Sequence, residues 1–483
     1  MVLCCGILNA PSLMIKFNII LLVAWANGLI VKPTLIDDNV GLRKARRPTW
    51  LSTPNSSSFK KPIIKPMNTN HVLALAKQSK SAANSLSSTS ESQRNLALSK
   101  MADSLEAIKH QVLEVNAQEV LKARQKGQSD ALIKRLTIDD KVFKYMISRL
   151  RKVAQYPDPL NRVLSGHTNP NGLQVYKKSV PLGVIGIIYE SRPNVTSDAA
   201  GVCIKSGNAV ILRGGSEALQ TNILLADAMI EGAVQAGLPE HAIQIIRTPG
   251  HEAVNELLAM DEYIDVLIPR GGKDLIKRIA EGTRIPVIKH YDGICHLYLA
   301  QDAEPAQAVE LTINSKCQSI QVCNALETLL VDKNCAKQLL PLLKTALAAK
   351  HIELRGCAQT KKLLPDIYSA TEDDWHSEYL APILSIKIVN GINEAIAHIN
   401  HYGSGHTDGI VTQSLAMAKQ FEQQVDSASV LINASTRLSG GGDYGLGSVI
   451  GISTDKLHAR GPVGPDELTT YKWVVYGNGH LRD

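Results

Sequence analysis

The sequence predicts an α/β fold with a doubly wound parallel sheet, followed by a second α/β unit. Between residues 184 and 300, short apolar runs alternate with amphipathic stretches, which is typical of parallel strands joined by helices. The run VIGIIYE (184–190) is almost entirely apolar, as expected for a strand buried on both faces. The alternation returns after residue 300, and 483 residues suffice for two or three domains.

The elements can be placed in order along the chain. Residues 71–155 have apolar side chains at three- and four-residue spacing and predict helices. LQVYKKSV (173–180) alternates and predicts an exposed ribbon. Strands after residue 184 are predicted at 208–215, 243–248, 263–272, 285–291 and 296–300, with helices at 216–237 and 273–282. The second unit is predicted to hold strands at 325–332 and 383–389 and helices at 303–316, 334–350 and 390–402.

Positive charge is concentrated at the N-terminal end of the chain. Residues 1–66 contain nine Lys and Arg and two Asp, which accounts for the whole net charge of +7. The other 417 residues carry 43 basic and 43 acidic side chains. Because no basic face is implied, nucleic acid is not an expected partner.

Residues 1–66 also differ in composition. An apolar run at 17–31 is short for a membrane span, and a basic stretch rich in Ser and Pro follows it. We interpret the segment as a leader, a disordered extension or a misassigned start. The core of a signal peptide and a membrane anchor are the alternatives.

Cysteine usage bears on compartment and metal. The eight cysteines are scattered, with no CxxC pair or zinc-like spacing, so no structural metal is expected. Scattered thiols in a large chain favour a reducing compartment, and we expect a cytoplasmic protein. Organelle targeting or membrane tethering would apply if residues 1–66 are retained.

Two predicted strands end in an arginine and paired glycines. Glycines let a backbone approach a ligand, and the N-terminus of a following helix favours an anion. Neither loop is GxGxxG or GxxxxGK[ST], so ordinary turns are the alternative. The candidate cofactor-binding residues are Arg213, Gly214, Gly215 and Ser216 in the first loop and Arg270, Gly271 and Gly272 in the second.

Longer motifs carry a family resemblance. From about Met67 to the C-terminus, the chain resembles the gamma-glutamyl phosphate reductases, which belong to the aldehyde dehydrogenase superfamily. The similar segments include VPLGVIGIIYESRPNVTSDAA, GNAVILRGGSEALQTN, IPRGGKDLIKRI, VCNALETLLV, HSEYLAPILSIKI and NASTRLSGGGDYGLG.

The resemblance implies a domain organisation. A cofactor-binding domain is expected at 67–290, with a ribbon near 173–181, and a catalytic domain at 291–430. Residues 431–483 are expected to return to the cofactor domain and to supply an oligomerisation strand, LTTYKWVVYG (468–477), beside the ribbon. A homo-oligomer is therefore expected.

The resemblance also implies a reaction, in which L-glutamyl 5-phosphate is reduced with NADPH to glutamate 5-semialdehyde and phosphate. This is the second step of proline biosynthesis. The chain has no kinase domain, so a separate glutamate 5-kinase must supply the acyl phosphate, and an association between the two enzymes is a further hypothesis. NADP rather than NAD is a family expectation.

Cys323 is the expected nucleophile, since superfamily members place theirs in a loop before a strand, as in VCNALETLLV. A thiolate suits the displacement of phosphate from an acyl phosphate. Cys295, followed by His296, is the rival. Neighbours in a strand point to opposite faces, so these two side chains should not meet.

Further roles follow from the resemblance alone. Asn194 resembles the asparagine that helps hold the oxyanion, although a turn asparagine after Pro193 is the alternative. Glu378 resembles the glutamate that binds the nicotinamide ribose, or is a solvated glutamate before a strand. The substrate-binding candidates are His406, Thr407, Asp408 and Arg437.

Other positions separate the competing functions. Hydrolytic aldehyde dehydrogenases carry a glutamate base ahead of the cysteine, where this chain has Lys289 and His290. That difference favours reduction over aldehyde oxidation. The family usually has Gln-Arg-Pro where this chain reads Gln318-Ser319-Ile320, and a glutamate at Val449. An aldehyde dehydrogenase of other substrate range and a non-catalytic family member remain as alternatives.

Overall fold

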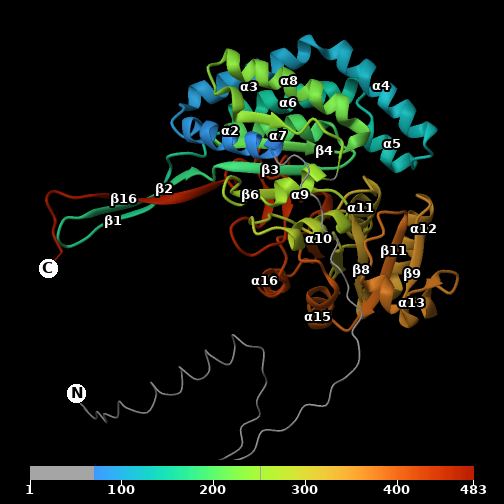
Figure 1. Ribbon diagram of the computed structural model, residues 1–483. Coiled ribbons are helices and arrows are strands. Elements are labelled where there is room, and N and C mark those ends of the chain that lie inside the picture. The colour runs from blue at the N-terminus through green and yellow to red at the C-terminus, as the bar shows by residue number, and fades with distance from the viewer. Residues whose placement is uncertain (1–69, 251, 483) are drawn as a thin grey trace, which may run out of the picture. The chain divides into compact units, whose positions relative to one another are not determined.

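The computed structural model describes residues 70–250 and 252–482 (Figure 1). The predictions made for residues 1–66 lie outside this range. Within it, no helix combines the length and apolar character needed to cross a membrane.

The described chain begins with five helices, as the periodicity predicts. Side chains of Ser90, Ser129 and Asp139 accept hydrogen bonds from backbone N–H groups and cap three of them. The helices are α2 (Asn70–Leu86), α3 (Glu91–Ala107), α4 (Lys109–Gln125), α5 (Asp130–Leu136) and α6 (Asp140–Gln155).

The first sheet has four parallel strands in the order β5-β4-β3-β6. Buried residues of these strands and of α2, α3 and α6–α10 form one apolar core. The strands are β3 (Val184–Tyr189), β4 (Ala209–Gly214), β5 (Ile243–Ile245) and β6 (Val266–Arg270). The helices are α7 (Asn194–Lys205), η1 (Ser216–Ala218), α8 (Leu219–Gln235), η2 (Glu240–Ala242), α9 (Glu252–Leu258) and α10 (Lys273–Gly282).

The strand order places a switch point between β3 and β6. The chain proceeds outward from β3 to β4 and β5, then returns to the other side of β3 to form β6. Ligands of open α/β sheets bind at such points, beyond the carboxyl ends of the strands. The strand predicted at 285–291 is wrong, because this segment makes only a single bridge, between Val287 and Leu267.

The second sheet has seven parallel strands in the order β10-β9-β11-β8-β7-β12-β13. Two separate apolar clusters, one with α11 and α12 and one with α15 and α16, pack on it. The strands are β7 (Cys295–Leu299), β8 (Leu326–Asp332), β9 (Glu353–Gly356), β10 (Tyr368–Ser369), β11 (Ile383–Val389), β12 (Thr407–Val411) and β13 (Ser429–Ile432). The helices are α11 (Pro305–Cys317), α12 (Lys333–Ala348), α13 (Ala358–Leu363), α14 (Glu372–Trp375), α15 (Ile392–Tyr402), α16 (Leu415–Gln424) and η3 (Thr436–Leu438).

A separate antiparallel ribbon combines β1 (Val163–Thr168), β2 (Gln174–Pro181) and β16 (Thr469–Tyr476). β16 pairs with β2 as the family resemblance implies, whereas β1 was not predicted. Figure 1 shows the three strands extending together away from the two sheets. Trp473 and Val163 are more than half exposed on it, at 58% and 55%. A last hairpin joins β14 (Gly451–Ser453) to β15 (Gly461–Val463).

Helices α3 and α8 cross at Gly232. A Cβ atom at this position would lie 2.6 Å from the backbone atoms of Lys100 and Met101. Backbone atoms of a buried helix cannot rotate away as a side chain can, so the two helices would have to separate.

We therefore expect Gly232→Ala to destabilise the protein, by roughly 1–3 kcal/mol from overpacking. The sign of the change in the free energy of unfolding is informative, because alanine in a helix interior is otherwise favoured over glycine. Gly201→Ala in α7 is the matched control, since its Cβ would meet no backbone atom of another element, only the ends of the Leu150 and Leu98 side chains. Urea unfolding of both variants measures the difference, and equal stability would contradict the interpretation.

Candidate active site

A cavity of about 1440 Å³ opens where the two sheets approach each other. Such a volume exceeds that of an ordinary small-ligand pocket and suits a cofactor together with a substrate. Most of the predicted site residues line it, namely Asn194, Arg213, Gly215, Ser216, Arg270, Gly271, Gly272, Cys323, Glu378 and Arg437. Gly214, His406, Thr407 and Asp408 are not among the lining residues.

The cavity joins opposite ends of the two sheets. The first sheet contributes the carboxyl ends of β3 and β6, where Arg192 and Arg270 lie. The second contributes the amino ends of its strands, since Cys323 precedes β8 and His406 directly precedes β12. Residues distant in sequence therefore meet around one thiol.

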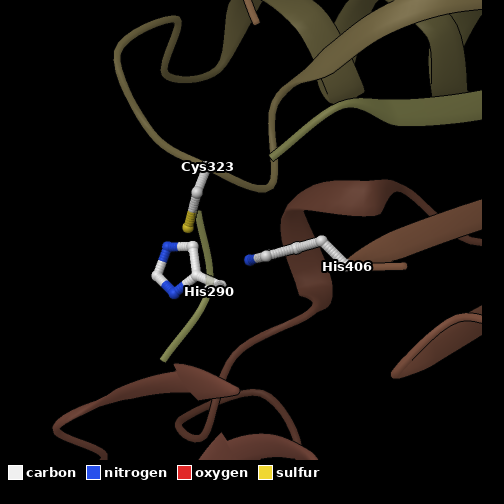
Figure 2. Close-up of side chains that lie close together, drawn as sticks. All are labelled: His290, Cys323 and His406. Carbon is white, nitrogen blue, oxygen red and sulfur yellow. The ribbon is translucent and has the colours of Figure 1, made fainter. Parts of the chain in front are cut away.

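Cys323 lies between two histidines. The Sγ atom and one ring nitrogen each from His290 and His406 all lie within 4.8 Å of one another, and Figure 2 shows both rings directed at the sulfur. His290 places Nδ1 2.8 Å from the carbonyl oxygen of Ile452. A carbonyl can only accept, so Nδ1 carries the proton and the other ring nitrogen faces the thiol.

His406 is held in a similar way. Its Nδ1 lies 2.8 Å from Thr407 Oγ1, and the Thr407 hydroxyl donates to Ser439 Oγ at 2.8 Å. Since that hydroxyl proton is already used, His406 Nδ1 is the donor to Thr407. The remaining ring nitrogen points to Cys323 (Figure 2).

These contacts favour a thiolate. Burial would raise the pKa of the Cys323 thiol, but the charge of His406 and the close approach of both histidine rings hold that pKa well below its usual range. Burial, the largest single effect, lowers the pKa of His290. The close contact with Cys323, the charge of its thiolate and the hydrogen bond with Ile452 together outweigh burial, and the net shift of the pKa is upward. Cysteines of this kind are reactive nucleophiles.

The loop that carries Cys323 is fixed by its neighbours. A Cβ atom at Gly293 would overlap the carbonyl group of Cys323, so only glycine permits this approach. The Cys295 thiol donates to the same carbonyl oxygen at 3.2 Å. Asn324 donates to the carbonyl oxygen of Ser439 at 2.9 Å.

Cys295, the rival candidate for the nucleophile, supports the loop that carries Cys323. It is fully buried, and burial raises the pKa of its thiol well above the usual value. His296 turns the other way, with Nδ1 2.8 Å from Asp408 Oδ1. The two neighbours do face different partners, as their positions in a strand predict.

The predicted substrate role of Thr407 and Asp408 needs correction. Both side chains are fully buried behind the cavity. Thr407 orients His406, and Asp408 accepts hydrogen bonds from the backbone N–H of His296, at 2.8 Å, and from Ser427. They position other groups, because a ligand in the cavity cannot reach them. These hydrogen bonds leave no mark in the local sequence.

The first predicted cofactor loop is partly used by the protein itself. The Arg213 guanidinium donates to the carbonyl oxygens of Gly214 and Gly250, both at 3.0 Å. Glu119 accepts from the backbone N–H groups of Gln220, at 2.9 Å, and Thr221, at 3.2 Å. The first turn of α8 therefore does not offer the free anion site that the sequence suggests.

The glycines still suit a nucleotide. A Cβ at Gly272 would meet no atom within 4 Å, so bare backbone faces open space there. Gly215 and Ser216 line the same cavity at the end of β4, and Glu378 lines it nearer to the thiol. Burial, followed by repulsion from the Cys323 thiolate, raises the pKa of Glu378. A dinucleotide could thus extend from the β4 loop to Glu378.

Asn194 begins α7 and lines the cavity. Its Nδ2 donates to Asp198 Oδ2 at 3.2 Å, which leaves the second N–H of the amide for a ligand. At the position of the absent glutamate base, Lys289 forms an ion pair with Asp455 at 2.9 Å. It is therefore already engaged.

Sequence reasoning missed Arg192, which follows β3 and lines the cavity. The sequence feature that could have indicated Arg192 is its position between a predicted buried strand and the helix that follows. Together with Arg270 and Arg437 it makes the surroundings of the thiol positive. The Cys-His-His set has metal-ligand chemistry and could in principle hold Zn²⁺. The three arginines oppose a cation and favour an anion.

Both the sequence and the fold have known relatives. The sequence pattern of the aldehyde dehydrogenase family matches residues 63–359 and 365–445. A gamma-glutamyl phosphate reductase from Thermotoga maritima is 40% identical, with a TM-score of 0.83 over 86% of this chain and 100% of that one. An acetylating aldehyde dehydrogenase from Geobacillus thermoglucosidasius is 19% identical, with a TM-score of 0.62 over 86% and 98%, and shares the fold.

Replacement of Gly293 by alanine should displace the Cys323 backbone and reduce alkylation of the thiol by iodoacetamide about tenfold or more. The measurement is the alkylation rate at Cys323, followed by mass spectrometry. Gly442→Ala is the control, because a Cβ there would meet no atom within 4 Å. An unchanged rate in Gly293→Ala would show that the loop tolerates the displacement.

The ionisation of Cys323 predicts a pH profile. Because the folded pKa lies well below the usual value, alkylation should stay fast as pH falls through 8 and decline only in more acidic solution. His406→Gln should move the midpoint of the profile upward, since a neutral amide cannot stabilise the thiolate by charge. A midpoint near that of a free cysteine in the unsubstituted protein would contradict the assignment.

Proposed function

Because the chain belongs to the aldehyde dehydrogenase family, and within it to the gamma-glutamyl phosphate reductases, we propose that it reduces L-glutamyl 5-phosphate to L-glutamate 5-semialdehyde and phosphate. The observation that carries the proposal is the position of Cys323 between His290 and His406 in positive surroundings, which holds the pKa of its thiol well below the usual range. Such a site suits an acyl group activated by an anionic leaving group.

The first step is displacement at the acyl carbon. The Cys323 thiolate forms an S–C bond to the acyl carbon. The bond between that carbon and the bridging oxygen breaks, and phosphate leaves with the oxygen and the electron pair of the bond. A negative charge develops on the acyl oxygen during attack. The free N–H of the Asn194 amide can donate to this oxygen, provided that the substrate lies between the two side chains.

The second step is reduction of the thioester. A nicotinamide bound beside Glu378 would supply a hydride to the acyl carbon. Addition of hydride leaves a negative charge on the oxygen of the former thioester. This oxygen then reforms the carbonyl of the aldehyde, the C–S bond breaks, and its electron pair returns to Cys323 as thiolate. His290 and His406 stabilise that thiolate again, so no proton needs to be added to the sulfur.

A reductase differs from a hydrolytic dehydrogenase in that no general base activates water to attack the thioester. The lysine at the usual base position is paired with Asp455 and cannot activate water. Glu378 is the feature that favours a second candidate, a hydrolytic aldehyde dehydrogenase, because its raised pKa would suit a general base. Dependence on phosphate distinguishes the two.

Further parts of the proposal concern cofactor, partners and compartment. We assign NADPH as the cofactor, a separate glutamate 5-kinase as the source of substrate, and the ribbon of β1, β2 and β16 as the contact of a homo-oligomer. The six described cysteines are all free, which supports a reducing compartment such as the cytoplasm.

The test uses the reverse reaction of the full chain. With glutamate 5-semialdehyde and NADP⁺, NADPH should form only when phosphate is present, and Cys323→Ala should lose this activity by at least about a thousandfold. Cys357→Ser is the control, because Cys357 lies at the N-cap of α13, where serine is favoured. Phosphate-independent NADPH formation would instead support the hydrolytic enzyme.

A further inference from the structure

Two arginines meet at the switch point of the first sheet. Arg192 follows β3, and Arg270 ends β6, where it pairs with Tyr189 in the strand register. Both side chains line the cavity. In residues 70–250 and 252–482, neither guanidinium has a hydrogen-bond or ion-pair partner.

Their juxtaposition is unfavourable without an anion. Burial, then the charges of Arg270 and Arg135, lower the pKa of Arg192 to about 10. Burial also lowers the pKa of Arg270. Two like charges held in a partly desolvated place repel each other, and a ligand of opposite charge removes that cost.

Three acidic side chains in the cavity wall already have partners of their own. Asp198 forms an ion pair with Arg149 at 3.1 Å. Glu190 accepts from the backbone N–H of Gly272 at 3.1 Å, and Glu217 accepts from the N–H and hydroxyl of Ser191 at 2.7 Å. Val449, also in the cavity wall, adds no charge.

Both arginines lie within electrostatic reach of Cys323. The Cys323 thiolate raises the pKa of both Arg192 and Arg270, so its charge reaches both guanidinium groups. Arg437 also responds to the thiolate, but its guanidinium is held by Gln318, at 2.9 Å, and Asn324. Arg192 and Arg270 are therefore the arginines left free for a ligand at the sulfur.

We infer that Arg192 and Arg270 form the subsite for the phosphate group that leaves when Cys323 is acylated, an inference that rests on the proposed function. In an acyl phosphate, a single bridging oxygen separates the phosphorus from the carbon that the sulfur attacks, so the phosphate must lie beside the sulfur. The α-carboxylate of the same substrate is three carbons further away. Two planar guanidinium forks match a phosphate dianion in charge and geometry.

The subsite acts on the leaving group. As the C–O bond breaks, charge accumulates on the phosphate, and the two arginines stabilise it in place before it departs. In the reverse direction they hold inorganic phosphate for attack on the thioester. Arg270, which the sequence assigns to the cofactor, serves the substrate instead.

Kinetics of the reverse reaction test the assignment in the full chain. Arg192→Gln and Arg270→Gln should each raise the KM for phosphate about 10- to 100-fold, while the KM values for NADP⁺ and semialdehyde stay within about twofold. Arg270→Lys should recover part of the loss, since it restores charge without the fork. Arg284→Gln, which removes an exposed arginine paired with Asp261, is the control for charge alone.

Calorimetric titration with inorganic phosphate separates this inference from the proposed function. If the reverse reaction fails but the protein binds phosphate and both glutamine variants lose that binding, the reaction is wrong and the subsite stands. If the protein itself binds no phosphate, or the variants bind it unchanged, the subsite is wrong. A rise in KM for NADP⁺ alone would return Arg270 to the cofactor. Thermal unfolding identifies a variant that does not fold. If one of Arg192→Gln, Arg270→Gln and Arg270→Lys fails to fold, phosphate binding by the other two tests the subsite.

Discussion

Stabilisation of a negative charge on Cys323 is the constraint on which the site depends. A thiolate away from bulk water is unfavourable unless cationic or hydrogen-bonding groups surround it. His290 and His406 supply both at close range, and three arginines add charge around them. The same surroundings that stabilise the sulfur also attract an anionic substrate, so one electrostatic arrangement serves ionisation and binding.

The fold brings these groups together by joining opposite ends of two sheets. The carboxyl ends of β3 and β6 supply arginines, and the amino ends of β7, β8 and β12 supply the nucleophile and its support. Much of the surrounding polar network fixes position and touches no ligand. Thr407 sets the His406 ring, Cys295 holds the Cys323 carbonyl, and Glu119 closes the first turn of α8.

The parts predictable from sequence are those with a local signal. Buried strands such as 184–189 are readable from their apolar runs, and the cysteine loop from its motif. The segment 285–291 has strand-like composition, yet it lies at the edge of β6 with one bridge and is not a strand. The roles of Glu119, Thr407 and Asp408 depend on partners more than ten residues away or on strand pairing, which no local pattern encodes.

The lowered pKa of Cys323 also makes its sulfur sensitive to oxidation. A thiolate that attacks an acyl carbon also attacks peroxide, and its first product, a sulfenic acid, can neither accept an acyl group nor release an aldehyde. His290 and His406 cannot favour one electrophile over the other, because they act on the sulfur alone. Oxidative stress would therefore silence this catalyst at its nucleophile before it damaged the fold, and flux through the enzyme would follow the redox state of its compartment.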